Sequence, residues 1–211
     1  MSARDDILGR VRAALTDVPA DEQRQVDWQY GRATPLASVI DTFAENIDEY
    51  GARLTRVAPD DLPGAMAAAL TDAGARSVVV PHDLDESWLS EVRGLMVVPD
   101  HGQLTARELD GIDAVVTASL VSSAETGTIC LDHGVGQGRR AISLVPDIHV
   151  CVVAVDSVVS DIPEAVARLH ASAAAGRPIT WISGGSATSD IELDRVEGVH
   201  GPRRLHVLLV G

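Results

Sequence analysis

The chain has 211 residues, of which 45 % are hydrophobic and 23 % are charged, as is typical of one soluble globular domain. Its net charge of −14 repels polyphosphate and anionic lipid, which argues against nucleic-acid binding and against an anionic membrane surface. No run approaches the ~20 apolar residues of a membrane span, and the N-terminus lacks the apolar segment of a secretory signal. We therefore expect a cytoplasmic protein.

The first part of the chain predicts a helical arm followed by a polar linker. Residues Ser2–Leu15 fit a helix because a serine can cap its start and apolar residues recur on one face. Residues 16–35 are polar and contain two prolines, which indicates a surface linker. A second amphipathic helix is predicted over Leu36–Tyr50. We divide the chain into a helical arm with its linker, 1–35, and a main domain, 36–211.

From residue 52 the pattern changes to alternating strands and helices. Short, continuous apolar strands between helical segments are typical of a parallel sheet that is covered on both faces. The predicted strands are Arg53–Val57, Ser77–Val80, Leu95–Val98 and Ile112–Thr117, and the predicted helical segments are Asp60–Ala73, Asp85–Val92 and Thr105–Leu109. The expected fold class is therefore α/β, with a mostly parallel sheet and helices on both faces.

After residue 117 the next predicted strands are separated by loops without helices, so we expect a locally antiparallel portion. These strands are Thr128–Leu131, Ala141–Leu144 and His149–Val155. A helix, Ile162–Ala175, and two strands, Ile179–Ile182 and Leu205–Val210, complete the predicted order of elements.

The stretch Ser122–Asp147 contains a carboxylate, Glu125, between small residues and directly before an apolar strand. We expect this carboxylate to be partly desolvated, which suits general acid–base or nucleophilic chemistry. The neighbouring Thr126 and Thr128 add hydroxyls. The alternative is a carboxylate that accepts backbone N–H bonds and only fixes a turn.

Further along this stretch, Gly134, Gly136 and Gly138 recur at two-residue spacing, and Arg139 and Arg140 follow directly. Such glycines suit a backbone that turns sharply or approaches a ligand closely. Bare N–H groups with guanidinium groups can hold an anion. The alternative is a glycine-rich hairpin with solvated arginines.

A second glycine-rich segment, Ser183–Glu192, follows an apolar strand. Ligands of α/β sheets lie beyond the carboxyl ends of strands, and this segment offers N–H groups and hydroxyls to an anion. It lacks the endings of a P-loop and of a dinucleotide fold, so ATP and NAD are not supported. The alternative is a helix capped by Ser186 or Ser189.

Histidine spacing predicts no metal site, because neither HxH nor HExxH occurs. His149 and His206 lie in predicted strands and are interpreted as structural residues. His133 and His200 adjoin glycine-containing turns, so either could reach a binding site.

The chain has only two cysteines, Cys130 and Cys151, both in apolar runs. We interpret them as reduced core residues rather than redox or metal ligands. Because iron–sulfur clusters are normally held by four thiolates, this chain cannot hold one with its own cysteines.

Three motifs, in this order, resemble the LUD domain of the lactate utilization protein C family. They read AETGTICLDHGVGQGRRAISLVPDIHVCVV, GGSATSDIEL and GVHGPRRLHVLLVG. The similarity covers residues 36–211 and is densest after Ala118. Gly184-Gly185 stands where the family usually has Gly-Pro, and Ser189 where it usually has Ala. The resemblance implies a fold like that of ribose-phosphate isomerases, glucosamine-phosphate deaminases and CoA transferases.

The resemblance also implies a role in oxidising L-lactate to pyruvate, beside partner proteins that carry iron–sulfur clusters, with no cofactor on this chain. CoA transferases use a glutamate nucleophile, so fold analogy makes Glu125 the expected catalytic residue. We expect a pocket for a small carboxylate or phosphate, with Arg139 pairing with the anion. The expected ligand-binding residues are Thr126, Gly127, Thr128, Gly136, Gly138, Arg139, Gly184, Ser186, Thr188, Asp190, Glu192 and His200.

Two other functions remain open on the sequence. The chain could be a stand-alone enzyme acting on a sugar phosphate or an acyl-CoA. It could also be a non-catalytic assembly subunit, in which the N-terminal arm holds a partner or a neighbouring copy in an oligomer.

Overall fold

The computed structural model describes residues 2–17, 33–188, 196–198 and 200–211. The chain divides into two compact units, residues 1–30 and 31–211. Most of the predicted linker, 16–35, lies outside the described residues.

The N-terminal unit contains helix α1 (Ala3–Ala14), which confirms the first predicted helix. Its cap is reciprocal: the Asp5 N–H donates to the Ser2 hydroxyl over 3.3 Å, and the Ser2 N–H donates to the Asp5 carboxylate over 2.9 Å. Three apolar side chains of this unit are largely exposed: Ile7, Val11 and Leu15. Taken by itself, the N-terminal unit therefore carries an apolar stripe along α1.

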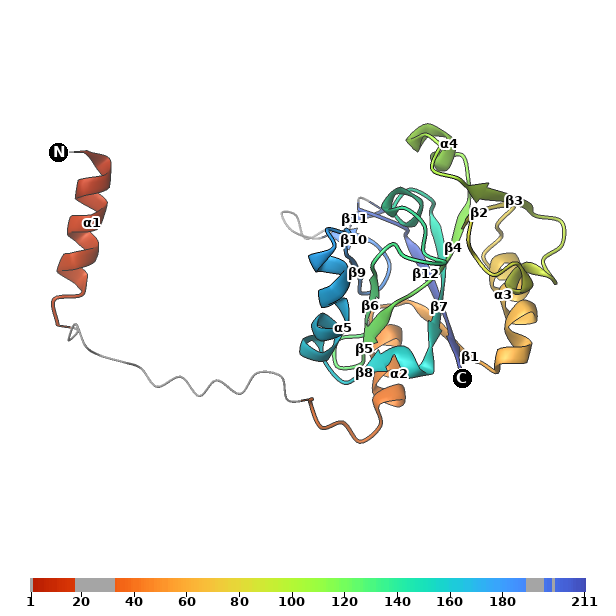
Figure 1. The fold of residues 1–211 in the computed structure, drawn as a ribbon, viewed down its shortest axis with the longest axis horizontal. Coiled ribbons are helices and arrows are strands. Elements are labelled where there is room, and N and C mark those ends of the chain that lie inside the picture. Colours follow the sequence, from red (N-terminus) through yellow and green to blue (C-terminus); the bar gives the residue numbers. More distant parts are fainter. Residues whose placement is uncertain (1, 18–32, 189–195, 199) are drawn as a thin grey trace. The chain divides into compact units, whose positions relative to one another are not determined.

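The main domain is built on a six-stranded sheet in which all neighbouring strands are parallel (Figure 1). In spatial order the strands are β1 (Arg53–Val57), β12 (Arg204–Val210), β7 (Ile148–Ala154), β4 (Ala114–Ala118), β2 (Ser77–Pro81) and β3 (Met96–Asp100). Every residue of β2 is buried, as expected where both faces of a strand are covered. The prediction of a mostly parallel α/β sheet is confirmed.

A smaller sheet packs on one face of the first. Its order is β8 (Val158–Val159), β5 (Val121–Ser123), β6 (Thr128–Leu131) and β9 (Thr180–Ile182). Strand β6 is antiparallel to both β5 and β9. Of the three strands in the predicted antiparallel portion, only Thr128–Leu131 is therefore confirmed. A short antiparallel pair follows, β10 (Ala187–Thr188) and β11 (Val196–Glu197).

Helices cover both faces of the main sheet (Figure 1). The helices of the main domain are α2 (Val39–Glu49), α3 (Leu62–Asp72), α4 (Ala106–Asp110) and α5 (Ile162–Ala174). Its 3₁₀ turns are η1 (Pro59–Asp61), η2 (Glu86–Leu89), η3 (Arg140–Ser143) and η4 (Val155–Ser157). Helix α3 buries Met66 and Leu70 on one face, and α2 buries Phe43 and Ile47 on the other, together with residues of β6. Helix α5 covers the face of the smaller sheet that is turned away from the main sheet.

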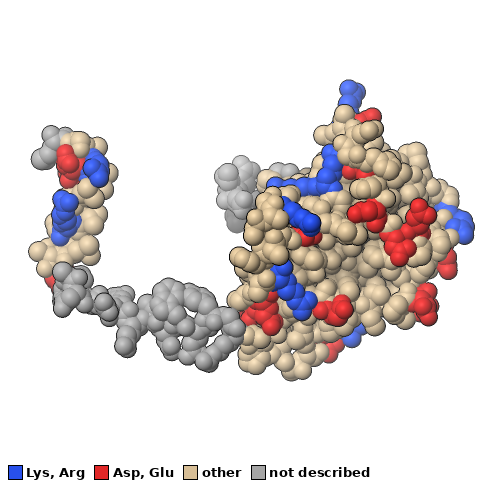
Figure 2. Space-filling view, viewed as in Figure 1, with Lys and Arg blue, Asp and Glu red and all other residues tan. Residues whose placement is uncertain are grey.

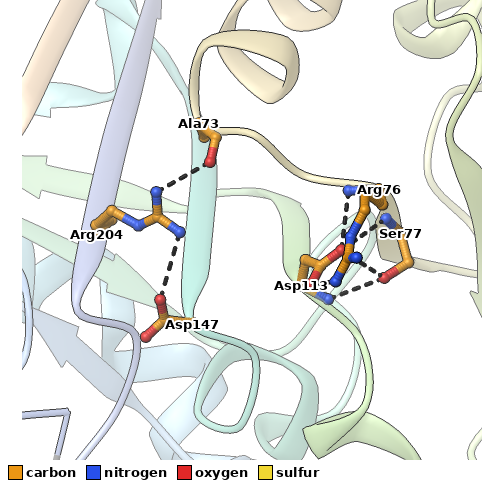
Figure 3. Close-up of polar contacts among 6 residues, drawn as sticks. All are labelled: Ala73, Arg76, Ser77, Asp113, Asp147 and Arg204. Atoms are coloured by element: carbon orange, nitrogen blue, oxygen red, sulfur yellow. Dashed lines mark hydrogen bonds and ion pairs between the residues drawn. The ribbon is translucent and has the colours of Figure 1, made fainter.

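Carboxylates tie together the amino ends of neighbouring strands (Figure 3). Asp113, just before β4, accepts N–H bonds from Arg76 at 2.9 Å and from Ser77 at 3.1 Å, at the start of β2. Asp147, just before β7, pairs with Arg204 at the start of β12 over 3.4 Å. The polar groups at this edge satisfy one another, so they serve to hold the strands in register.

Two predicted strands were wrong in type or placement. The segment Ala141–Leu144 is mostly the 3₁₀ turn η3, in which Ile142 is fully buried without strand pairing. The segment His149–Val155 corresponds to β7, which is a parallel strand inside the main sheet rather than part of the antiparallel portion. Strands β5 and β6 take the place of a crossover helix between β4 and β7, so no helical pattern marks that connection.

The surface of the main domain carries acidic and basic side chains interspersed on the face shown in Figure 2. Several ion pairs join exposed side chains, such as Arg53 with Asp72, and pairs of this kind contribute little to stability. Among the described residues, no helix combines the length and the apolar character that crossing a membrane requires.

Candidate functional site

Two turns that are distant in sequence meet at a row of hydrogen-bonded hydroxyls. The Thr126 Oγ1 lies 2.8 Å from the Thr128 Oγ1, which lies 2.8 Å from the Ser183 Oγ. The pairing of β6 with β9 causes this meeting, because it sets Ile129 opposite Ile182, next to both hydroxyls. The turn after β5 and the turn after β9 therefore lie side by side.

A pocket of about 250 Å³ opens at the turn after β9, and we call it the serine pocket. Its polar side chains are Ser143, His149, Thr180, Ser183, Ser186 and His200. The described lining residues include no carboxylate and no guanidinium group. The pocket is therefore uncharged while His149 and His200 are neutral, and its hydroxyls can either donate or accept hydrogen bonds.

Glycines shape the turn that forms one wall of the serine pocket. Gly184 has a φ of +84° and packs so closely that a Cβ there would lie 2.7 Å from the Tyr50 Cβ. A Cβ on Gly185 would lie 2.2 Å from the backbone oxygen of Arg203, so any side chain there requires the backbone to shift. With the backbone as it lies here, the two glycines let the turn pack closely against its neighbours, which brings the following serine into the pocket.

Ser186 is held by the segment that leads into β12. Its N–H donates to the Pro202 carbonyl over 2.8 Å, and its carbonyl accepts the Gly198 N–H over 2.9 Å. Its hydroxyl accepts the His200 N–H over 3.0 Å. Because the Ser186 hydroxyl still has its own proton to donate, it is a fixed donor at the pocket wall. The structure thus brings together three predicted residues: Gly184, Ser186 and His200.

His149 lines the same pocket from β7 and is only 1 % exposed. Its Nε2 lies 2.8 Å from the hydroxyl of Thr117 on the neighbouring strand β4. Burial lowers the pKa of His149 to about 4, because desolvation disfavours the imidazolium. The sequence interpretation of His149 as purely structural missed its place in the pocket.

Glu125 lies elsewhere, in a hollow of about 370 Å³ that it shares with Asn46, Glu49, Tyr50 and Thr126, and which we call the Glu125 hollow. The side chain of Glu125 is exposed, so the expected desolvation of this carboxylate is not observed. The Asn46 side chain donates to the Ala124 carbonyl over 2.8 Å and to the Glu125 carbonyl over 3.0 Å.

The turn after Glu125 requires a glycine at position 127. Gly127 has a φ of +55°, and a Cβ there would lie 2.9 Å from the Asn46 Cβ. The turn is therefore shaped by its contact with α2. The hydroxyl row from Thr126 through Thr128 to Ser183 links a residue that lines the Glu125 hollow to one that lines the serine pocket.

The glycine-rich loop after β6 closes around a buried carboxylate. Asp132 is 3 % exposed and accepts four bonds, from Gly134 N–H at 3.0 Å, Gln137 amide at 2.9 Å, Ser172 hydroxyl at 2.6 Å and Arg177 guanidinium at 3.0 Å. Desolvation raises the pKa of Asp132, but these hydrogen bonds and the Arg177 charge outweigh it and hold the pKa below its usual value. The Asp132 carboxylate is therefore fully engaged by groups of the loop and by the side chains of Ser172 and Arg177.

Arg139 ends this loop with its guanidinium already engaged. It binds the Asp100 carboxylate at the end of β3 through two bonds, of 2.7 and 3.2 Å, and also donates to the Leu104 carbonyl. Asp100 is 4 % exposed, so this is a fork-shaped pair with a buried acid. The expectation that Arg139 would pair with a ligand anion is not met, because its bidentate edge is taken.

Gly136 and Gly138 serve the same loop rather than the serine pocket. Their φ values are +69° and +64°. A Cβ on Gly138 would lie 2.5 Å from the Ile142 Cδ1, and one on Gly136 would lie 3.3 Å from the Ala118 Cβ. The two glycines let the loop lie close over the carboxyl ends of β2 and β4, so their role is in packing.

Of the remaining predicted residues, Thr188 lies in β10, while Asp190 and Glu192 lie outside the described residues. The sequence analysis missed His149, Ser143, Thr180 and Ser183 as pocket residues. Ser183 follows a predicted strand directly, which is a usable signal. Nothing in the local pattern marks His149, because it lies in an apolar strand like any core residue.

Cys130 and Cys151 are free and buried, and burial raises the pKa of each thiol to about 12.

Comparison with known proteins places this chain within a family. The LUD domain family matches residues 40–210. A Deinococcus radiodurans protein named lactate utilization protein C is 52 % identical over 83 % of this chain and 81 % of its own length. A protein of the same name from Halalkalibacterium halodurans is 29 % identical over 82 % of this chain and 79 % of its own length.

A solved structure supports the same assignment. The crystal structure of a DUF162 family protein from Deinococcus radiodurans matches with a TM-score of 0.73 and 46 % identity, covering 84 % of this chain and all of that chain. The main-domain fold and the family match agree in extent. The chain therefore belongs to the LUD domain family.

Proposed function

We propose that this chain acts in lactate utilization, as a cytoplasmic subunit of a system that oxidises L-lactate to pyruvate, and that the serine pocket binds the small carboxylate. The observation that carries the proposal is the 52 % identity, over most of both chains, to a protein named lactate utilization protein C.

The chemistry of the serine pocket supports a small hydroxy or keto acid. Its volume of about 250 Å³ is several times the ~30 Å³ that one water molecule occupies in the liquid, so a three-carbon acid fits. The hydroxyls of Ser183 and Ser186 and the glycine backbone between them offer donors to a carboxylate. Apolar walls such as Leu205 and Ile182 suit a methyl group.

The ligand contacts that we propose are Gly184, Ser186 and His200, with Ser183 held in place by Thr128. Thr188, Asp190 and Glu192 follow directly in sequence and remain proposed contacts. Glu125 lines the neighbouring hollow instead, so we assign it no contact with the bound acid.

Partner proteins supply the electron acceptor in this proposal. Conversion of lactate to pyruvate releases two electrons and two protons, and the two buried thiols of this chain are too few for an iron–sulfur cluster. We propose that the electrons pass to iron–sulfur clusters on partner proteins, while this chain binds the acid.

The test has a binding arm and an activity arm. In a thermal-unfolding assay, a true ligand at 100 times its Kd adds roughly 2.7 kcal/mol of stability, and we expect this for L-lactate or pyruvate. Ribose 5-phosphate and CoA serve as competing ligands, since the alternative of a stand-alone enzyme predicts that they stabilise the chain instead. In the activity arm, the chain and its partners should reduce a dye in a lactate-dependent way, and Ser186→Ala should weaken this reduction. If neither acid binds, the proposal is wrong.

A second function, assembly, is favoured by the exposed apolar stripe on α1. Ile7, Val11 and Leu15 are exposed on one side of this helix, and apolar stripes of this kind commonly bind partners. We propose that α1 binds an iron–sulfur partner protein. Deleting residues 1–35 should abolish co-purification with the partner while the main domain keeps its unfolding transition. A complex that survives the deletion would exclude this role.

A further inference from the structure

We propose that the serine pocket takes up its carboxylate together with one proton, and that His149 is the group that accepts this proton. This inference rests on the proposed function, because it assumes that a small carboxylate enters the pocket. It adds a residue and a pH dependence that the binding proposal by itself does not require.

The lining of the pocket creates the need for a proton. A carboxylate that leaves water for a buried site loses much of its hydration energy unless a charge or strong hydrogen bonds replace it. Among the described lining residues there is no arginine, and the nearby Arg139 guanidinium is engaged with Asp100. Hydroxyls alone satisfy the oxygens but leave the charge unbalanced. Protonation of a lining histidine balances it.

His149 is placed to do this. It is 99 % buried, it lines the pocket, and its Nε2 is held by the Thr117 hydroxyl. Within the described part of the chain, the hydroxyl of Thr117 is the only hydrogen-bond partner of the ring, so Nδ1 has none. The Thr117 hydroxyl also lies 3.7 Å from the Cys151 sulfur. When its O–H points to the sulfur, it accepts a bond from the Nε2–H of His149, and Nδ1 keeps a lone pair for a proton.

The other two histidines near the pocket are less suited. Both ring nitrogens of His133 are engaged, Nδ1 at 3.0 Å from the Gly138 carbonyl and Nε2 at 2.8 Å from the Thr180 hydroxyl. His200 is exposed, whereas His149 is buried. His149 combines burial with a free ring nitrogen.

The surroundings of His149 leave it sensitive to an arriving charge. The titratable groups around it are Cys151 on its own strand, His200 in the pocket, His133 beyond Thr180, and Asp147 at the start of β7, which is paired with Arg203 and Arg204. Among the described residues, burial is the cause that lowers the pKa of His149. A carboxylate in the pocket places a negative charge beside the ring and raises its pKa.

A defined pH dependence follows. The free protein holds His149 neutral down to about pH 4, whereas the complex holds it protonated at higher pH. Between these two pKa values binding takes up a proton, so the affinity for the carboxylate rises as the pH falls, by up to about tenfold per pH unit.

The experiment is isothermal titration calorimetry of the full chain with pyruvate and with L-lactate, at pH 6, in two buffers that differ in ionisation enthalpy. The difference in apparent binding enthalpy between the buffers gives the number of protons taken up, and we expect a positive uptake of at most one proton per bound acid. L-lactamide, the neutral amide of lactate, is the matched ligand and should bind with no uptake. His149→Gln should abolish uptake by the acids, whereas His200→Gln should keep it.

A second measurement uses the unaltered protein, in case His149→Gln does not fold. Nitrogen-15 NMR of the histidine rings should show one buried imidazole that becomes protonated at pH 6 only when pyruvate is added. Binding without proton uptake overturns the inference and leaves the proposed function standing. Proton uptake that is lost in the His200→Gln variant also overturns the inference. No binding of either acid at any pH contradicts the proposed function as well.

Discussion

The two glycine-rich turns of this chain look alike in sequence but differ in where their polar groups point. In the loop after β6, the Asp132 carboxylate accepts four bonds and Arg139 is fixed on buried Asp100. In the turn after β9, Ser183 and Ser186 line an open pocket, and glycine is required only to bring the backbone close to its neighbours.

Closely spaced glycines therefore indicate a tightly packed backbone and do not by themselves indicate a ligand-binding site. A loop whose donors and acceptors are all satisfied within the protein is a structural element, however well its composition resembles an anion site. A turn that leaves hydroxyls on a pocket wall can bind. Substitutions in the two turns test this contrast.

Arg139→Ala should destabilise the main domain by about 3 kcal/mol, because it leaves the buried Asp100 carboxylate without its partner. The free energy of unfolding in urea measures this loss. Arg140→Ala is the matched control, since this neighbouring side chain is exposed and its removal should cost less than about 0.5 kcal/mol.

The affinity of folded Arg139→Ala for pyruvate should stay within about twofold of the unaltered protein. If the variant instead keeps its stability and loses its affinity, the glycine loop would be the binding site and the contrast between the two turns would be reversed.

Gly185→Ala should cost about 1–3 kcal/mol of stability, because its Cβ meets the Arg203 carbonyl oxygen at 2.2 Å. The displaced turn should also weaken pyruvate binding by more than tenfold. Gly201→Ala is the control in the same pocket, where a Cβ would lie 3.8 Å from the Ser186 Cβ. Equal effects of the two substitutions on binding would show that the backbone approach at Gly185 does not shape the pocket.

The stability of the unaltered protein should fall as the pH decreases from about 6.5 to about 4. In this range the unfolded chain binds protons at His149 and His206 that the folded protein excludes, because burial lowers the folded pKa of each to about 4. His149→Gln should reduce this slope and leave the part that His206 contributes. His133→Gln, in the glycine loop, should flatten it less, since its pKa is lowered without a large shift. A slope that His149→Gln leaves unchanged would contradict the assigned burial.

Ser186→Ala should weaken pyruvate binding by roughly fivefold, which corresponds to about 1 kcal/mol for one lost hydrogen bond. Glu125→Gln should change the affinity by less than twofold, because this carboxylate lies in the other hollow. Calorimetric titration of both variants gives the comparison. A larger loss from Glu125→Gln than from Ser186→Ala would move the site to the Glu125 hollow.

Much of the fold was predictable because its strands are short apolar runs with clear ends. Strand β1, Arg53–Val57, was predicted to the residue, and β2 and α5 to within one residue at either end. The parallel position of β7 was not predictable from local spacing, because strands rather than a helix connect it to β4. Local patterns also could not show that Ile142, although buried, lies in a turn rather than in a strand.

The site was predictable only in part. Ser186 and His200 were predicted, because both adjoin glycines near strand ends. His149 could not be found by pattern, since a buried histidine in a strand looks like a core residue until the neighbouring pocket is known. The engagement of Arg139 by Asp100 joins residues 39 positions apart, and no short motif carries information over that distance.

The most direct test of the binding claim is a crystal structure of the full chain with pyruvate. We expect electron density for the acid in the serine pocket, with its carboxylate within hydrogen-bond distance of the Ser186 hydroxyl and of the His149 ring. Density beside Arg139, or in the Glu125 hollow with the serine pocket empty, would contradict it.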